Sequence, residues 1–195
     1  DVCSSDLYVK QAEYPTELSN VNFRASLEDA DGSMARSVLQ VPAFHFELDG
    51  EPIDGRAMVE NFASPAYELQ ASGQLDLEKL MQIYPMDGMS LKGKLVVEDF
   101  VTAGTYADIE AERYTNLPTS GRVRVENLVY EDVELPGAVT VDRGEATFTP
   151  DRLSLSGVQG KLGRSDYAAE GYLSNYLAYA LLEHEPLQGE LALNS

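Results

Sequence analysis

The chain lacks several residue types, and each shortage argues against a class of protein. It has no tryptophan, one cysteine (Cys3) and two histidines, His45 and His184. A disulfide framework requires paired cysteines. The histidines are far apart in sequence and form no metal-binding spacing, so we expect both side chains to be solvated. Without tryptophan the aromatic platform of a sugar-binding site is poorly supplied, although 11 tyrosines keep that alternative open.

Basic residues are also scarce. The chain has 14 Lys and Arg against 33 Asp and Glu, which gives a formal net charge of −19. Such a surface repels phosphate backbones, so the composition argues against nucleic-acid binding and against simple docking on an anionic membrane. No apolar run approaches the roughly 20 residues of a membrane-spanning helix.

No motif of a catalytic, metal or cofactor site is present. The chain contains no Gly-x-Ser-x-Gly, and its glycine-rich segment 160–165 has Lys161 and Ser165 at the wrong offsets for a phosphate-binding loop. The acidic segment 28–32 lacks the glutamate that closes a calcium loop, because Gln40 stands at that position. We therefore expect no enzyme activity, no cofactor and no metal.

The first seven residues differ in character from the rest. The segment Asp1–Leu7 resembles the translated end of a sequencing adapter. We expect it to be non-native, and we expect the chain to be a piece of a longer protein. Cys3 belongs to this segment, so the expected native part contains no cysteine.

An eight-residue pattern recurs along the chain. It consists of a glycine, an alternating strand, an acidic-polar pair and an apolar residue. The copies are Gly55–Phe62, Gly93–Phe100 and Gly121–Leu128, with a partial copy at Gly189–Asn194. Such repetition is typical of stacked β architectures. We interpret the glycine as the start of each strand and the acidic-polar pair as its end in solvent.

A second repeat combines strands with a short helix. The motifs Ala71-x-Gly73-x-Leu75 and Ala169-x-Gly171-x-Leu173 each precede a short apolar run and another x-Gly-x-Leu motif. The spacing of Leu77, Leu80, Met81 and Tyr84 predicts one helical face, capped by Asp76 and ended by Pro85. A second helix is predicted over Asn175–Glu183.

The remaining pattern is period two, which is typical of half-buried strands. Phe44, Phe46 and Leu48 alternate with His45 and Glu47, and residues 121–173 read as an uninterrupted antiparallel meander. Residues 8–40 are a weakly patterned N-terminal part with one or two strands, and residues 41–195 form the repetitive domain. The predicted fold is mainly β: a long, antiparallel, curled sheet, either a groove or open and sandwich-like, with two short helices.

One-sided apolar stripes recur on strand after strand. Two interpretations are open: the stripes pack together in a sandwich core, or they line an open groove filled by acyl chains. The pattern alone favours the sandwich core, because sandwiches are common all-β folds. The candidate lining residues are Phe44, Phe46, Leu48, Leu69, Leu95, Val97, Val123, Val125, Val139, Val141, Phe148, Leu153 and Leu155.

Several short motifs carry a family resemblance over about two thirds of the chain. They are Leu75–Met81, Gly121–Leu128, Phe148–Leu153, Leu162–Tyr167, Gly171–Leu177 and Leu187–Leu193. In this order they resemble the C-terminal region of AsmA-family proteins, which are relatives of TamB and YhdP in the bridge-like lipid transfer superfamily. The motifs are small and none is catalytic.

The resemblance implies a periplasmic β-groove that shields acyl chains, for phospholipid transport and outer-membrane homeostasis in Gram-negative bacteria. The implied partners are a phospholipid or other acyl lipid, other envelope proteins, and the inner membrane through an N-terminal anchor expected outside this chain. Two alternatives stay open: a non-catalytic scaffold module of the cell envelope, and a carbohydrate-binding β-sandwich.

Overall fold

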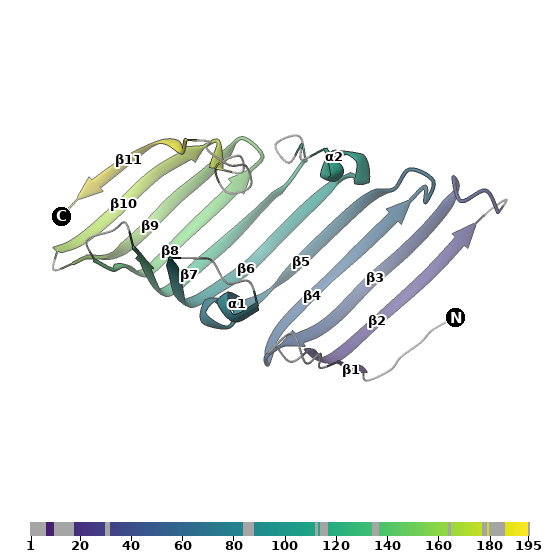
Figure 1. Ribbon diagram of the computed structural model, residues 1–195, viewed down its shortest axis with the longest axis horizontal. Helices are drawn as coiled ribbons and strands as arrows, with labels where there is room; N and C mark the ends of the chain where they lie inside the picture. The colour runs from purple at the N-terminus through teal and green to yellow at the C-terminus, as the bar shows by residue number, and fades with distance from the viewer. Residues whose placement is uncertain are drawn as a thin grey trace.

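The computed structural model describes residues 7–9, 18–29, 32–83, 88–111, 113, 117–133, 137–163, 165–176, 179 and 186–194. They form one antiparallel sheet of 11 strands that lie side by side in chain order (Figure 1). The strands are β1 Leu7–Val9, β2 Leu18–Asp29, β3 Ser37–Leu48, β4 Glu51–Glu60, β5 Ala66–Asp76, β6 Met89–Thr105, β7 Ser120–Asp132, β8 Val139–Thr149, β9 Arg152–Leu162, β10 Ser165–Ser174 and β11 Gln188–Asn194. The predicted long antiparallel sheet and the meander over 121–173 are confirmed.

The sheet is a single layer. A compact protein of 21.4 kDa exposes about 9,100 Å² of surface, whereas this chain exposes 12,750 Å². Among the described hydrophobic residues only Leu77, Leu117, Ala146 and Ala169 are buried. No second sheet is formed by the residues that the structure describes. The sandwich form of the fold prediction therefore does not hold for them.

Irregular pairing bends the strands. Register shifts occur between β2 and β3, β3 and β4, β5 and β6, β6 and β7, β8 and β9, and β9 and β10. One shift places an extra residue in β7 opposite Gly93, whose φ is 114°, and another places an extra residue in β9 beside Gly171, whose φ is 148°. Bulges of this kind increase strand twist and bending, and only glycine adopts such φ values without strain. Three glycines of the x-Gly-x-Leu repeat, Gly73, Gly93 and Gly171, thus lie beside register shifts, whereas Gly189 lies in unbroken register with β10.

The interpretation of the eight-residue repeat is wrong in two respects. Gly55 and Gly93 lie inside β4 and β6 and do not open them. The acidic-polar pair ends only β4; in β6 and β7 the strand continues past it. There the pair marks a backbone irregularity instead, because Asn127 has φ 51° and the β6–β7 register shifts between Val97 and Asp99.

Two short helices are described, at opposite ends of the strands (Figure 1). Helix α1, Leu77–Ile83, confirms the predicted first helix, and the Asp76 carboxylate accepts hydrogen bonds from the Glu78 and Lys79 amides at 3.0 and 3.2 Å. Helix α2, Tyr106–Glu110, was not predicted. The helix expected over Asn175–Glu183 falls largely outside the described residues.

The sheet continues through the boundary expected between residues 40 and 41. Both residues lie inside β3, which pairs with β2 on one side and β4 on the other. Strand β2 is 12 residues long, although the apolar and polar residues of its sequence alternate only weakly. Residues 1–6 of the expected non-native segment lie outside the described part.

Candidate functional site

A row of apolar side chains crosses the sheet at right angles to the strands. Residues that lie directly opposite each other in antiparallel strands project from the same face. The pairing aligns one such residue from each strand between β2 and β11. In strand order they are Phe23, Phe44, Gly55, Ala71, Phe100, Gly121, Phe148, Leu153, Leu173 and Gly189. We call this set the aromatic row.

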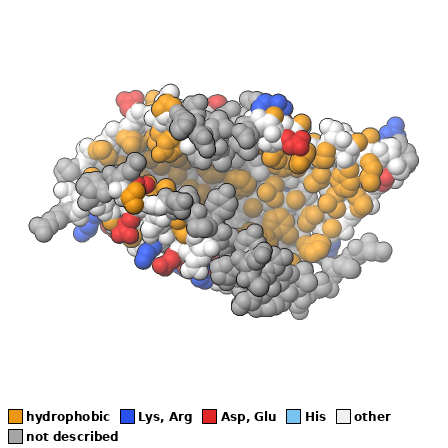
Figure 2. All heavy atoms as spheres, in the orientation of Figure 1, with side chains coloured by type: hydrophobic (Ala, Val, Ile, Leu, Met, Phe, Trp, Pro, Cys, Tyr) orange, Lys and Arg blue, Asp and Glu red, His pale blue; other side chains and the backbone are white. Residues whose placement is uncertain are grey.

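A second row runs beside the first on the same face. Its members lie two positions further along most strands, and three in β6, where the register shifts. In order from β3 to β11 they are Phe46, Ile53, Gly73, Val97, Val123, Ala146, Leu155, Gly171 and Leu191. Figure 2 shows hydrophobic side chains gathered across this hollowed face. At about 4.8 Å per strand, ten strands give the aromatic row a length of about 43 Å.

Glycines in the aromatic row make room for the rings of their neighbours. A Cβ atom on Gly121 would lie 2.6 Å from Cζ of Phe148, and one on Gly55 would meet the ring of Phe44. The Phe100 and Phe148 ring centroids are 6.1 Å apart, on either side of Gly121. The rings therefore pack flat over the neighbouring glycines and do not project from the face.

All 13 candidate lining residues lie on this apolar face. Eleven belong to the two rows or lie an even number of positions from a row member on the same strand. Val141 joins them because its Cγ1 lies 3.5 Å from the position of a Cβ on Gly144, and Val139 is two positions away. Every one of the 13 is half-buried: it contacts its lateral neighbours but carries no covering layer.

Sequence reasoning missed the small members of the same face. Ala71, Gly73 and Ala146 stand in phase with the apolar stripes but were not counted as lining residues. Phe23 and Leu191, near the two ends of the sheet, were also missed, and both are exposed, at 41% and 45%. These residues can be found in the sequence by taking every second position of each predicted strand, whatever the size of its side chain.

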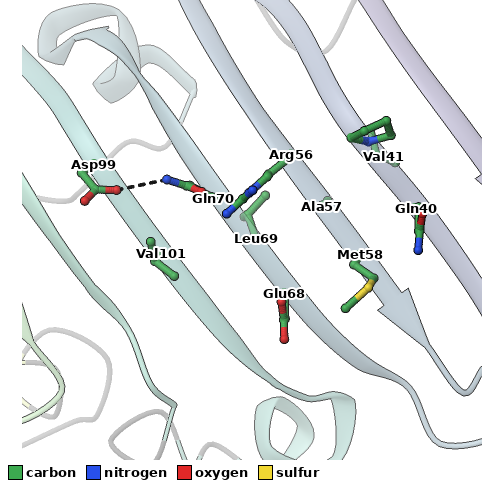
Figure 3. Close-up of a pocket in the computed structure, with 11 residues that line it drawn as sticks. Gln40, Val41, Arg56, Ala57, Met58, Glu68, Leu69, Gln70, Asp99 and Val101 are labelled. Carbon is green, nitrogen blue, oxygen red and sulfur yellow. Dashed lines mark hydrogen bonds between the residues drawn. The ribbon is translucent and has the colours of Figure 1, made fainter.

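The opposite face is polar and carries ion pairs between strands. Glu98 lies between Arg122 and Arg124, at 3.5 and 3.3 Å. On the same face the Gln70 amide donates to Asp99 at 3.4 Å, beside a shallow hollow of about 510 Å³ that Arg56 also lines (Figure 3). These groups are exposed to solvent, so their pairs contribute little to stability.

The pKa values of Asp108, Tyr167 and Tyr176 are shifted. Burial, and secondarily the charge of Asp142, raises the pKa of Tyr167, whose hydroxyl donates to the Thr140 carbonyl oxygen at 3.0 Å. Tyr167 lines a mostly apolar hollow of about 390 Å³ with Val139, Leu162 and Leu193. This hollow lies at the β8–β11 end of the sheet.

One histidine is described, and it lies on the surface. Nδ1 of His45 lies 2.8 Å from Oδ1 of Asp54, and both side chains are exposed, as expected for a solvated histidine. His184 falls outside the described residues. Within the described ranges no three His, Cys, Asp or Glu side chains gather to hold a metal ion. The described helices also include none long and apolar enough to span a bilayer.

Comparisons of the chain with protein-family models, with curated proteins and with solved structures give no match. The distinctive property of the sheet is an apolar face, crossed by two continuous rows, that no other described element covers.

Proposed function

We propose that this chain is a periplasmic segment of an AsmA-like protein whose apolar face shields lipid acyl chains. In the full-length protein the segment is tethered to the inner membrane and serves phospholipid transport and outer-membrane homeostasis. The observation that carries the proposal is the pair of open apolar rows across the sheet. The motifs that resemble the AsmA family support the same assignment.

The energetics favour an apolar occupant over water. Soluble monomers rarely expose a contiguous apolar patch larger than a few hundred Å². Removing one CH₂ group of an acyl chain from water is worth about 0.8 kcal/mol, and the rows offer only aliphatic, phenyl and glycine surface. Such contacts have little directionality, so a bound chain slides along the rows at low cost. No covalent step is needed, in keeping with the proposal of a non-enzymatic protein.

The two alternatives make different demands on the sheet. A scaffold module with a closed core requires a second apolar layer, and none is formed by the described strands. A sugar-binding face requires polar groups beside exposed aromatic rings. The two rows contain Phe but neither Tyr nor a polar side chain. Both observations favour the lipid occupant.

Site-specific photo-crosslinking tests the proposal. A photoreactive residue at Val125 or Phe148 on the apolar face should crosslink to phospholipid in cells, and mass spectrometry of the purified chain should detect the lipid. Arg124 and Thr147 are matched controls, because each is the exposed chain neighbour on the polar face. Equal crosslinking at all four positions, or lipid-free protein with no crosslink at Val125 and Phe148, would overturn the proposal. Binding to a glycan panel would favour the sugar-binding alternative.

A further inference from the structure

The apolar face is bounded by two rims, which are formed by the ends of the strands. Because neighbouring strands are antiparallel and follow chain order, the ends of β3, β5, β7 and β9 lie together with the starts of β4, β6, β8 and β10. This border carries α1, and the opposite border carries α2 (Figure 1). We define the α1 rim and the α2 rim as the three residues of each strand nearest that border, with the described residues that connect the strands there.

Carboxylates outnumber cations at both rims. The α1 rim holds two lysines, Lys79 and Lys161, and eight carboxylates: Glu47, Asp49, Glu51, Asp76, Glu78, Glu131, Asp132 and Asp166. The α2 rim holds four arginines, Arg36, Arg113, Arg122 and Arg152, and eight carboxylates: Glu28, Asp29, Glu60, Glu68, Asp108, Glu110, Asp151 and Glu190. The two apolar rows contain no charged residue. A lipid whose chains lie on the rows therefore brings its head group into water beside an excess of negative charge.

The described cations of the rims already have partners. The partners are the Asp49 carbonyl oxygen for Lys79 at 2.7 Å, Asp166 for Lys161 at 3.5 Å, Asp108 for Arg113 at 2.9 Å, Glu98 for Arg122 at 3.5 Å, and the Tyr172 ring for Arg152 at 3.8 Å. Arg36 is engaged as well. A lipid phosphate would have to displace one of these partners. By contrast, the exposed carboxylates Glu28, Glu60 and Glu131 form no ion pair with a described cation.

We propose that the apolar face selects phospholipids with a zwitterionic, ammonium-bearing head group, of the phosphatidylethanolamine kind, over anionic lipids such as phosphatidylglycerol. This inference rests on the proposed function, because it concerns the head group of the same lipid. The ammonium group is attracted to the carboxylates at either rim. An anionic head group carries no compensating charge and is repelled, and juxtaposition of like charges is a general way to reject a ligand.

The selection depends on salt because the rim charges are exposed. Charges in water interact weakly and are screened over about 8–10 Å at ordinary ionic strength. We therefore expect an enrichment of about fivefold at low salt, which falls to about one in 1 M salt, where the screening length is about 3 Å. Apolar contacts with the two rows are not screened, so the total amount of bound lipid should not fall with salt.

Lipid uptake from mixed vesicles tests the selection. The lipid-free protein is incubated with vesicles that contain phosphatidylethanolamine and phosphatidylglycerol in equal amounts with identical acyl chains, and its bound lipid is then identified by mass spectrometry. Both lipids come from the same vesicle, so repulsion between protein and vesicle affects them equally. We expect about fivefold more phosphatidylethanolamine at low salt. Equal uptake at low salt, or an excess of phosphatidylglycerol, would overturn the selection and leave lipid binding in place. Uptake of neither lipid would overturn both the selection and the proposed function.

Charge variants test whether the rims cause the selection. The rim variant combines Glu28→Gln, Glu60→Gln and Glu131→Gln. The matched control combines Glu126→Gln, Glu145→Gln and Glu170→Gln, which are exposed positions on the polar face away from both rims, and it changes the net charge equally. We expect the enrichment to fall to about twofold in the rim variant and to stay about fivefold in the control. An equal enrichment in the two variants would contradict selection by the rims.

Discussion

The ring of Phe148 lies over Gly121 of the neighbouring strand. The two residues are direct partners in the β7–β8 pairing, and a Cβ on Gly121 would lie 2.6 Å from Phe148 Cζ. Phe44 and Gly55 repeat this relationship on β3 and β4. In these two copies of the eight-residue repeat, the glycine therefore leaves the space in which a phenyl ring of the neighbouring strand packs.

Substitution of Gly121 by a larger residue should destabilise the sheet. Gly121→Ala forces Phe148 aside and also brings the new methyl group against the Asp99 carbonyl oxygen, so we expect a loss of about 1–3 kcal/mol in the free energy of unfolding. Gly137→Ala is the matched control, because nothing lies within 4 Å of its Cβ position. Chemical denaturation measures both. Equal midpoints for the two variants would contradict the packing of Phe148 on Gly121.

A polar substitution in the second row should separate lipid binding from stability. Val123→Ser removes part of a half-buried side chain, and we expect it to cost about 1 kcal/mol, since full burial of a valine contributes about 1.5–3 kcal/mol. Retained phospholipid should fall markedly in the same variant. Arg122→Ser, on the exposed polar face, should leave lipid content unchanged. A loss of several kcal/mol in Val123→Ser would instead indicate a covered core.

The cap of α1 can be tested by one substitution. The Asp76 carboxylate accepts from the Glu78 and Lys79 amides, so Asp76→Ala should cost about 1 kcal/mol. Asp76→Asn keeps an oxygen acceptor and should cost much less. Hydrogen exchange of residues 78–80 reports the cap directly. Identical exchange in the two variants would argue against capping by this side chain.

Helix α2 should depend on pH through Asp108. The Thr105 hydroxyl, at 2.6 Å, and then Arg113 lower the pKa of Asp108 below its ordinary value. A lowered pKa in the folded state means that the stabilisation is present above the unfolded pKa and is lost as pH falls through the folded one. Thr105→Val should raise the pKa of Asp108, as measured by NMR titration, so α2 frays at a higher pH. An unchanged pKa would exclude the hydroxyl as the main cause.

Local pattern predicted most of the strands because alternation is a local property. Phe44, Phe46 and Leu48 show their common face in the sequence itself, and Asp76 with the spacing of Leu77 and Leu80 shows the start of α1. Helix α2 escaped prediction because five residues are too few for a helical period. Its cap involves Thr105 and Asp108, which are common residues in any polar segment.

The same pattern could not predict that the described strands form one sheet without a second layer. A strand that faces a sandwich core and a strand that faces an open groove both alternate apolar and polar residues. What separates them is whether another element packs against Val125 or Phe148, and that depends on contacts between segments far apart in sequence. The small members of the aromatic row, such as Gly55, Ala71 and Gly121, were also not recognised, because the row follows strand register and not chain order.

The strict chain order of the strands has a consequence for how such a protein changes in length. Among the described strands, each one hydrogen-bonds only to its neighbours in chain order. Inserting or deleting one hairpin would lengthen or shorten the sheet by about 10 Å and leave all other pairings intact. With 195 residues in 11 strands, each increment takes about 36 residues. The length of the sheet across its strands therefore grows with the number of hairpins, in units small enough for a single duplication to supply.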